Sequence, residues 1–447
     1  MIPTWHGIRV TASSSCAHGV QSSDKFTFVP VCVGGLRQRT MASVPYYDHI
    51  VVGCGGVGSA ALYWLSRRAG KGVLGLEQFK LGHDNGGSQD HSRIIRLSYH
   101  HPRYTRLLKD SYQAWEEVEK ESGLKLVYKT GGLDFTLKGP LEEVMEDYAK
   151  AMDSQGIPYE RLDGPEIHRR FPQFEVGPET VGLYQPDGGL VDAARGNAAH
   201  IQLARAHGAT VMDECAVLGI ERLKSGLILV RTGKGEFRCR RVVVCAGAWV
   251  NDVLRYVGTK IPISVSQEQV TYFATPNIKE FTKDRFPIWL YFAPDYILYG
   301  LPIHGNTGSK IGIDYGRTHV TPGTRTYTPD PVREKASIEF LQKYIPRSLG
   351  PVLYTKTCLY TVTMDRNFVL DTLDAKGWPE IIVCCGAGHA YKFAGLLGKI
   401  LSQLAIDGRT QHHIDDFTFN RPAVTDPNFK LDFYLGGNKE DTLMAKM

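Results

Sequence analysis

Apolar and polar positions first become regular along the chain at residues 49–52, where a β-branched run begins. This run leads into a glycine-rich turn and a helical segment over Ser59–Ala69. A second apolar run over Gly72–Leu76 then ends at the acidic Glu77. The succession predicts strand, turn, helix and strand, which is the opening unit of a nucleotide-binding parallel sheet.

Helical spacing of apolar residues recurs in later segments, and each is expected to pack one face against the core. A glycine turn is predicted at Gly188–Asp192, directly before one of these helices. The later predicted helices cover Tyr104–Gly123, Pro140–Gln155, Ala193–His207 and Phe393–Leu404. Short apolar runs predict strands at Thr210–Met212, Val217–Ile220, Leu227–Arg231 and Val242–Trp249.

Residues 262–357 follow a different pattern, with short aromatic-rich strands and little helix before Asp330. That pattern predicts a mostly antiparallel sheet in a domain of its own. The predicted fold class is therefore α/β, in an α+β arrangement of two domains, one Rossmann-like and one built on a mostly antiparallel sheet. The expected Rossmann-like domain covers 45–125, 190–261 and 366–430, the second domain covers 126–189 and 262–365, and 1–44 and 431–447 are expected to form a leader or disordered extension and a tail.

The turn after the first strand has the spacing Gly53-x-Gly55-x-x-Gly58, and it also contains Gly56 and Val57. In a dinucleotide fingerprint the first glycine permits the tight turn, the second lets the backbone approach a pyrophosphate, and the third allows close helix packing. The helix N-terminus offers N–H groups to phosphates. The chain thus has a predicted ADP-binding site, with Glu77 expected on a ribose hydroxyl, and the pattern leaves FAD and NAD open.

Composition narrows the class of protein. At 447 residues the chain suggests two or three domains, and 43% apolar with 22% charged residues is typical of a globular protein. A net charge of +5 with interleaved signs does not indicate nucleic acid, and no apolar run approaches the ~18–20 residues of a membrane span. Nine scattered cysteines, without zinc-type spacing, indicate reduced thiols and no metal site.

Several ordered motifs resemble one family, the monomeric sarcosine oxidase and L-pipecolate oxidase group of FAD-dependent amine oxidases. The resemblance covers about Tyr47–Pro422. After the fingerprint and LEQF at 76–79, the motifs are GSxxxSRIIR at 87–96, TGGL at 130–133, CAGAW at 245–249, YGLP at 299–302, CLYTVTMDRNFVLD at 358–371, GHAYKF at 388–393 and NRP at 420–422.

The resemblance implies a role for each matching residue. Cys358 stands where the family attaches FAD covalently, and Arg96 and Lys392 match the pair that holds the substrate carboxylate. Arg93 matches an arginine close to the flavin ring, and Lys310 matches a lysine associated with oxygen activation. The resemblance also places Tyr299 and Tyr360 in the site wall, and Ser92 and Lys392 beside the cofactor. Independently of the family, a predicted strand, glycine turn and helix near the C-terminus indicate a second cofactor contact at Gly386 and Gly388.

Without the family, these residues have ordinary interpretations. Lys310 would be a surface lysine on a strand, Cys358 a buried strand cysteine, and Arg93 and Arg96 solvated basic residues. These alternatives can be distinguished by burial and by contacts.

The chain departs from the family at two histidine positions and in the glycine turn 386–388, which is one residue shorter than the family's equivalent. Gln89 and Asp314 stand where relatives usually carry histidines. An acid at position 314 would favour a differently shaped or more cationic substrate and would be able to act as a base, whereas the alternative is a surface carboxylate at a strand end. We expect Gln89 and Asp314 to contact substrate.

The resemblance therefore implies an FAD-dependent oxidase of secondary amino acids, N-methyl or cyclic, such as sarcosine or pipecolate. The products would be an imine or aldehyde and hydrogen peroxide. The alternatives are a flavin-dependent amine dehydrogenase that passes electrons to a carrier, and a non-catalytic dinucleotide-binding protein. The expected partners are a small amino acid and molecular oxygen, with no nucleic acid and no membrane, and the expected state is a monomer.

The ends of the chain give two competing predictions of location. Ala445-Lys446-Met447 has the small–basic–hydrophobic form of a peroxisomal import signal, so an import receptor is a further expected partner. Residues 1–44 hold one acid and show no sustained period. They are either a transit-type leader or sequence that precedes a start at Met41. Peroxisome is the prediction, with the cytoplasm or an organelle addressed by residues 1–44 as alternatives.

Overall fold

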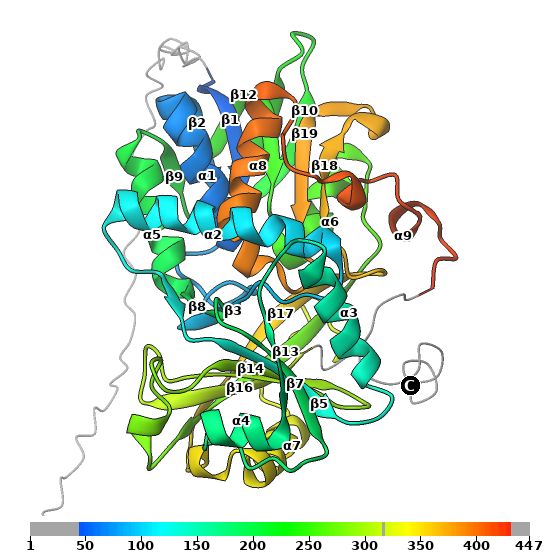
Figure 1. Ribbon diagram of the computed structural model, residues 1–447. Coiled ribbons are helices and arrows are strands. Elements are labelled where there is room, and N and C mark those ends of the chain that lie inside the picture. Colours follow the sequence, from blue (N-terminus) through cyan, green and yellow to red (C-terminus); the bar gives the residue numbers. More distant parts are fainter. Residues whose placement is uncertain (1–43, 315–317, 431–447) are drawn as a thin grey trace, which may run out of the picture. The chain divides into compact units, whose positions relative to one another are not determined.

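The computed structural model describes residues 44–314 and 318–430. The predicted leader and the C-terminal tripeptide lie outside the described residues, so the location of the protein stays a prediction. Among the described residues, two large sheets of mixed and antiparallel strands and a small third sheet carry nine α-helices (Figure 1). No described helix combines the length and the apolar character needed to cross a membrane.

The first sheet contains the fingerprint strand near its centre. Its strand order is β10-β11-β12-β1-β2-β9, with β19 beside β12 and β18 beside β19. The pairs of β1 with β12 and with β2 are parallel, as are β2 with β9 and β12 with β19. The strands are β1 (Tyr46–Val52), β2 (Val73–Leu76), β9 (Thr210–Met212), β10 (Val217–Arg222), β11 (Ile228–Thr232), β12 (Gly235–Val244), β18 (Val369–Leu373) and β19 (Trp378–Cys385).

The second sheet has the order β17-β13-β16-β15-β14-β5-β7-β6, and only the pair of β14 with β5 is parallel. The predicted combination of a Rossmann-like sheet and a mostly antiparallel one is confirmed. The strands are β5 (Gly132–Leu137), β6 (Glu160–Asp163), β7 (Thr180–Gln185), β13 (Ile263–Ala274), β14 (Ile288–Phe292), β15 (Ile297–Leu301), β16 (Gly308–Asp314) and β17 (Val352–Thr363).

A third sheet corrects one prediction. The turn predicted at Gly188–Asp192 is a strand over most of its length, because β8 (Gly189–Asp192) pairs with both β3 (Ser92–Ile95) and β4 (Val127–Lys129). Gly189 fits there because a Cβ atom would lie 2.0 Å from the Tyr128 carbonyl oxygen, so the glycine serves close strand approach and not a turn.

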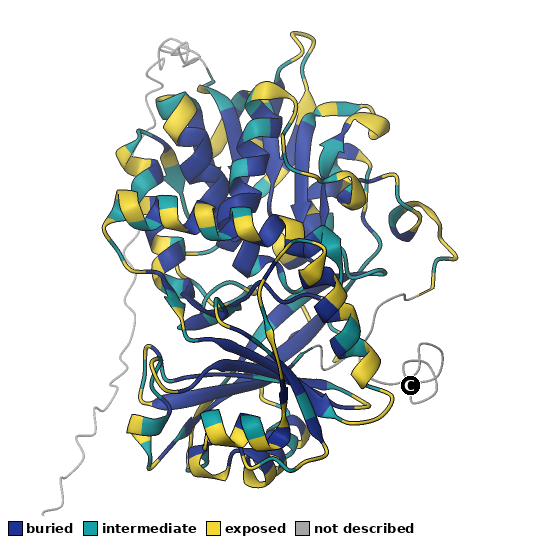
Figure 2. Ribbon diagram, in the orientation of Figure 1, coloured by how far each residue is buried: buried dark blue, intermediate teal, exposed yellow. Residues whose placement is uncertain are grey.

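Helices α1, α5 and α8 pack against the first sheet, whereas α4 and α7 pack against the second, and Figure 2 shows exposed residues along their outer sides. Helix α1 follows the fingerprint and contacts α5 and α8. The helices are α1 (Gly56–Ala69), α2 (Pro102–Ser122), α3 (Glu142–Asp153), α4 (Gly164–Arg170), α5 (Ala193–Ala206), α6 (Val250–Leu254), α7 (Pro331–Tyr344), α8 (Ala394–Asp407) and α9 (Pro422–Thr425).

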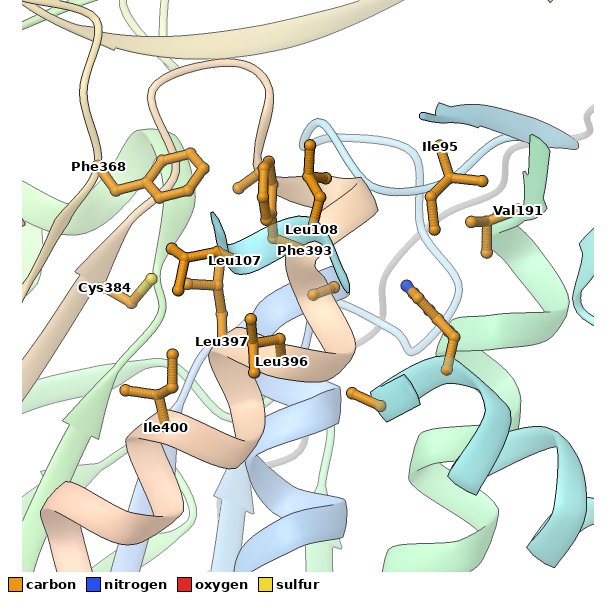
Figure 3. Packing of buried hydrophobic residues seen from close by; sticks show 14 of the residues in the cluster. Ile95, Leu107, Leu108, Val191, Phe368, Cys384, Phe393, Leu396, Leu397 and Ile400 are labelled. Carbon is orange, nitrogen blue, oxygen red and sulfur yellow. The ribbon is translucent and has the colours of Figure 1, made fainter. Parts of the chain in front are cut away.

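Helix α8 shows why the sequence folds this way. Its residues Leu396, Leu397 and Ile400 are fully buried, and Figure 3 shows them beside Leu107 and Leu108 of α2. Each such side chain stabilises the fold by about 1.5–3 kcal/mol through its removal from water. The helix ends at Gly408, which has a left-handed backbone and closes the last turn.

The fingerprint turn requires glycine at both ends. Gly53 has φ of +89°, a conformation that side chains disfavour. A Cβ atom on Gly58 would lie 1.8 Å from the Gly53 carbonyl oxygen, so only glycine lets α1 start this close to the strand. The helix N-terminus is thereby held beside the end of β1, where a phosphate would bind.

Candidate active site

One cavity of about 1410 Å³ runs from the fingerprint to the inner face of the second sheet. It exceeds the roughly 300–1,000 Å³ of a typical small-molecule pocket, which leaves room for a dinucleotide together with a substrate. Most predicted site residues line it. These are Gly53, Gly55, Gly56, Val57, Glu77, Gln89, Arg93, Arg96, Tyr299, Lys310, Asp314, Tyr360, Gly386, Gly388 and Lys392.

The nucleotide end of the cavity is built from backbone and one carboxylate. Glu77 is buried and accepts hydrogen bonds from the backbone N–H groups of Cys54, at 2.8 Å, and Phe79, at 3.0 Å. Its carboxylate is thus fixed at the end of β2, beside the glycine turn. Gly56 donates its N–H to the Ser88 hydroxyl at 2.8 Å, which ties the following loop to the start of α1. Gly58 does not line the cavity and has the packing role described above.

A second glycine turn, Gly386 to Gly388, follows β19 and also faces the cavity. Gly388 has φ of +82°, and a Cβ atom there would lie 2.7 Å from the Tyr360 ring. The close contact of ring and backbone lets both residues border the same space. This turn leads directly to Lys392, in a short 3₁₀ helix before α8.

The second sheet contributes side chains through its pleat. Successive residues of a strand point to opposite faces, and residues directly opposite on neighbouring strands share a face. Tyr272 is opposite Lys310, and Tyr299 is opposite Gly312. The same alternation places Asp134, Tyr272, Tyr299, Lys310, Asp314, Cys358 and Tyr360 on one face, while the opposite face carries an apolar core that includes Leu133, Phe135, Trp289, Leu298 and Ile311.

One carboxylate, Asp90, joins two of the predicted cations. Its Oδ2 accepts from Lys310 Nζ at 2.6 Å and from Arg93 Nη1 at 2.5 Å, and its Oδ1 accepts from the Tyr272 hydroxyl at 2.7 Å. Lys310 also donates to the Ser92 carbonyl at 2.8 Å, so Ser92 contributes backbone while its side chain lies outside the cavity wall. Lys310 is only 3% exposed, which excludes its interpretation as a surface lysine.

Burial and the neighbouring charges shift the pKa values of Lys310, Asp90 and Arg93 in opposite directions. Burial lowers the pKa of Lys310 to about 8, and Asp90 limits the decrease. Burial alone would raise the pKa of Asp90, but Lys310 and Arg93 hold it far below its usual range. Burial would lower the pKa of Arg93, whereas Asp90 raises it. The three groups are therefore two cations and one anion in a nearly dry site.

Arg96 is the second buried arginine of the motif, with 6% exposure, so it is not a solvated surface residue. Its Nη1 donates to Asp134 Oδ1 at 2.8 Å, and Asp134 also accepts from the Ser98 hydroxyl at 2.5 Å. Arg96 Nε is buried and has no hydrogen-bond partner among the described residues. A carboxylate in the cavity would satisfy that donor.

Lys392 differs from Arg93, Arg96 and Lys310, because it has no carboxylate partner among the described residues. It is 9% exposed, and its Nζ donates to the His389 carbonyl at 3.1 Å and to the Tyr99 hydroxyl at 3.5 Å. Burial, with Arg96 and Arg366 nearby, lowers the pKa of Lys392 to about 7. A ligand carboxylate would stabilise the charged ammonium group.

Asp314 forms an ion pair inside the cavity wall. Both of its oxygens accept from Arg366 Nη2, at 2.7 and 2.8 Å. Arg366 has φ of +53°, and its carbonyl accepts from the His389 ring at 3.0 Å, so a strained turn holds the guanidinium in place. Because Asp314 lines the cavity and is paired there, it is not a simple surface carboxylate at a strand end.

Cys358 lies half-buried on β17, opposite Glu268 of β13. Burial raises the pKa of its thiol, and Arg93 counteracts this effect. The thiol itself is not part of the cavity wall, although its neighbours Leu359 and Tyr360 are. The pleat places Cys358 on the same face as Tyr360, which directs it toward the cavity side of the sheet.

The sequence did not single out the partners of the predicted residues. Asp90 and Asp134 neutralise cations, Tyr272 binds Asp90, and Arg366 binds Asp314. Asp134 and Tyr272 could have been found from the alternation along their strands, because each is a polar residue on the same face as the predicted site residues. Arg366 lies inside the motif at 358–371, which was a signal for that residue, whereas Asp90 lies in a loop without a comparable one.

The comparisons with known proteins agree with this geometry. A family model described as FAD dependent oxidoreductase matches residues 48–404. Monomeric sarcosine oxidase of Bacillus sp. (strain B-0618) is 31% identical over 383 residues, which is 85% of this chain and 97% of that protein. Peroxisomal sarcosine oxidase of Homo sapiens is 30% identical over 383 residues, 84% of this chain and 96% of that protein.

Among solved structures, NikD, titled an unusual amino acid oxidase essential for nikkomycin biosynthesis, superposes with a TM-score of 0.75 at 28% identity, over 84% of this chain and 97% of that chain. The glycine cradle, the fixed Glu77 and the long cavity fit an FAD, and the match to the FAD dependent oxidoreductase model decides between FAD and NAD, which the fingerprint left open. The chain belongs to the FAD dependent oxidoreductase family and is an FAD-dependent amine oxidase of the sarcosine oxidase group.

Proposed function

We propose that the protein oxidises a secondary amino acid, N-methyl or cyclic, with FAD attached to Cys358 and with molecular oxygen as the electron acceptor. The products are an imine, which hydrolyses to an aldehyde or remains in a ring, and hydrogen peroxide. The observation that carries this proposal is the pair of buried ammonium groups, Lys392 and Lys310, which face one cavity and differ in their partners.

Charge at the Lys392 side supports an anionic ligand. Arg96 is balanced by Asp134, and Arg366 is balanced by Asp314. Lys392 adds one further positive charge that no described carboxylate balances. A single substrate carboxylate would neutralise it and satisfy Arg96 Nε.

The wall near these groups suits a small apolar substituent on the substrate. Leu290, Phe292 and Ile297 line the cavity together with Tyr299 and Tyr360. A carboxylate held by Lys392 and Arg96 would fix the neighbouring carbon and nitrogen against these side chains, which is catalysis by orientation. The names of the sarcosine oxidase relatives support a secondary amine as the group that reacts.

FAD, when bound, supplies the acceptor for the hydride equivalent that leaves the carbon next to nitrogen. The chain's own residues bind, orient and exclude water. Lys310 and Arg93 share the carboxylate of Asp90, so a buried ammonium group lies close to the arginine that the resemblance places beside the flavin ring. A fixed cation there would stabilise negative charge as it develops on oxygen. The two ammonium groups thus serve the two halves of the reaction.

Attachment of FAD through Cys358 is tested by acid precipitation of the purified protein. We expect the yellow colour to remain in the pellet, and to move to the supernatant in the variant Cys358→Ser, because serine provides no thioether. Cys384→Ser is the matched control, since Cys384 also lines the cavity yet should leave the colour in the pellet. Release of colour from the unmodified protein would contradict covalent attachment.

The role of Lys310 is tested by separating the two half-reactions. We expect Lys310→Met to retain anaerobic bleaching by a secondary amino acid and to slow reoxidation by oxygen about 100-fold or more, because the fixed charge is lost. Stopped-flow absorbance measures both steps. Lys356→Met, on β17 of the same sheet, should change neither. Equal loss of both steps would contradict the assignment, and reoxidation only by an added carrier would indicate a dehydrogenase.

The carboxylate site is tested by pH. Because the pKa of Lys392 is about 7, its charged form is lost as the pH rises through that value. The affinity for propionate, which has no amine to titrate, should be highest below pH 7 and should fall by up to about tenfold per unit above it. Calorimetric titration measures the affinity. Lys392→Met should bind propionate weakly with no such slope, whereas a constant affinity in the unmodified protein would argue against this site.

The Asp314–Arg366 pair generates a prediction about substrate choice. Asp314→Asn removes a negative charge from the wall, so an amino acid with a second carboxylate should gain in kcat/KM relative to sarcosine by about tenfold. Asp147→Asn is the matched control, because its carboxylate also borders the cavity but is exposed and screened by solvent. An unchanged ratio of the two substrates would show that the pair does not contact the substrate.

A further inference from the structure

Asp90 accepts more hydrogen bonds than any other acidic residue described in this site. Its two oxygens accept four hydrogen bonds, from Lys310 Nζ, Arg93 Nη1, the Tyr272 hydroxyl and the backbone N–H of His91. The carboxylate is 5% exposed. Nothing in the resemblance or the comparisons assigns a role to this position.

These bonds connect four separate parts of the fold. Asp90 lies in the loop before β3, Arg93 is on β3, Tyr272 is on β13 and Lys310 is on β16. Tyr272 and Lys310 are directly opposite in the sheet, and the Lys310 ammonium lies 5.8 Å from the Tyr272 ring. One carboxylate therefore fixes the position of an ammonium and a guanidinium from different sheets.

The geometry leaves Lys310 with one free donor. Its ammonium group has three N–H bonds, and two of them go to Asp90 Oδ2 and the Ser92 carbonyl. Within the described chain no third acceptor is present, and Lys310 lines the cavity. The remaining N–H is therefore available to a ligand in the cavity, and its direction is set by the other two bonds.

We propose that Asp90 is a positioning residue for oxygen reactivity: its carboxylate orients the Lys310 ammonium group toward the cavity and keeps it charged beside Arg93. This inference rests on the proposed role of Lys310. It adds that the chemistry of the lysine depends on a neighbouring acid that touches neither substrate nor oxygen.

The balance of charges explains why the acid is required. The charged or titratable groups that face Lys310 are Asp90, Arg93, Tyr272 and the Cys358 thiol, and its partner on β15, Leu301, is apolar. Burial and Arg93 both disfavour the ammonium form, and Asp90 is the main group that favours it. Without Asp90, two cations would lie together in a site nearly free of water, and the lysine would release its proton at a lower pH.

The first measurement is the titration of Lys310 itself. The purified holoprotein is labelled with lysine carrying ¹³C at the ε carbon, and the Lys310 signal is assigned by its absence in Lys310→Met. We expect the midpoint in Asp90→Asn to be lower by about one unit or more. Asp134→Asn is the matched control, because Asp134 is an equally buried acid that contacts Arg96 and Ser98 but not Lys310, and the midpoint should stay in place. An unchanged midpoint in Asp90→Asn would overturn the inference.

The second measurement is the pH profile of reoxidation by oxygen after anaerobic reduction. In Asp90→Asn the pH at which reoxidation slows should fall by the same amount as the titration midpoint, while anaerobic reduction changes less than about twofold. A shifted midpoint with an unshifted profile would overturn the role in oxygen reactivity. If the unmodified protein does not react with oxygen, the proposed function fails, and the titration still decides whether Asp90 controls Lys310.

A double variant covers the case in which Asp90→Asn does not fold, since that change leaves two cations without their anion. In Lys310→Met the second cation is already absent, so Asp90→Asn/Lys310→Met should fold. Its reoxidation rate should match that of Lys310→Met within about twofold, because the two residues act as one unit. A further decrease of tenfold or more would show that Asp90 acts independently of Lys310 and would overturn the inference.

Discussion

A buried positive charge is stable only when an opposite charge or a set of hydrogen bonds lies within reach, and this constraint organises the whole cavity. Three carboxylates, Asp90, Asp134 and Asp314, accept from cations that the motifs place there. Removing one partner from such a pair costs roughly 3–5 kcal/mol. The arrangement of the second sheet follows from this constraint, since its inner face carries Asp134 and Asp314 and receives Asp90 from the loop before β3, while its outer face carries an apolar core.

The two large sheets contribute different kinds of group. The first sheet contributes main-chain atoms, because parallel strands end together and glycines leave their N–H groups accessible beside α1. The second contributes side chains, because an antiparallel sheet with one solvated or cavity-facing side directs every other residue there. Substitutions on the inner face of the second sheet can therefore alter the side chains that line the cavity without altering the main chain that forms the glycine turns.

Much of this could be predicted from the sequence. Local periodicity predicts the fingerprint, the antiparallel region and the helices that correspond to α1, α2, α5 and α8. This pattern can be recognised without any knowledge of contacts between distant parts of the chain. Gly189 was misinterpreted because glycine is common both in turns and at close strand contacts, and only the neighbouring strands distinguish the two. The family resemblance pointed to Arg93, Arg96, Lys310 and Lys392, all of which line the cavity, and all of them except Lys310 lie inside a quoted motif.

The partners of those cations could not be predicted in the same way. Asp90 binds Lys310 across 220 positions of the chain, and such a contact depends on the register of strands that no local pattern defines. Asp134 and Tyr272 follow the strand alternation, but the alternation has meaning only once the face that borders the cavity is known. Ion pairs are thus properties of the folded sheet, whereas motifs are properties of the chain.

Lys392 joins the site to the helical layer. Its side chain faces the cavity, while its own carbonyl accepts from the Ser111 hydroxyl at 2.6 Å and from the Trp115 indole at 3.1 Å, both on α2. The ammonium group therefore takes its position from a helix that forms no part of the nucleotide cradle. A small displacement of α2 would therefore move the Lys392 ammonium group within the cavity without any substitution in the cavity wall.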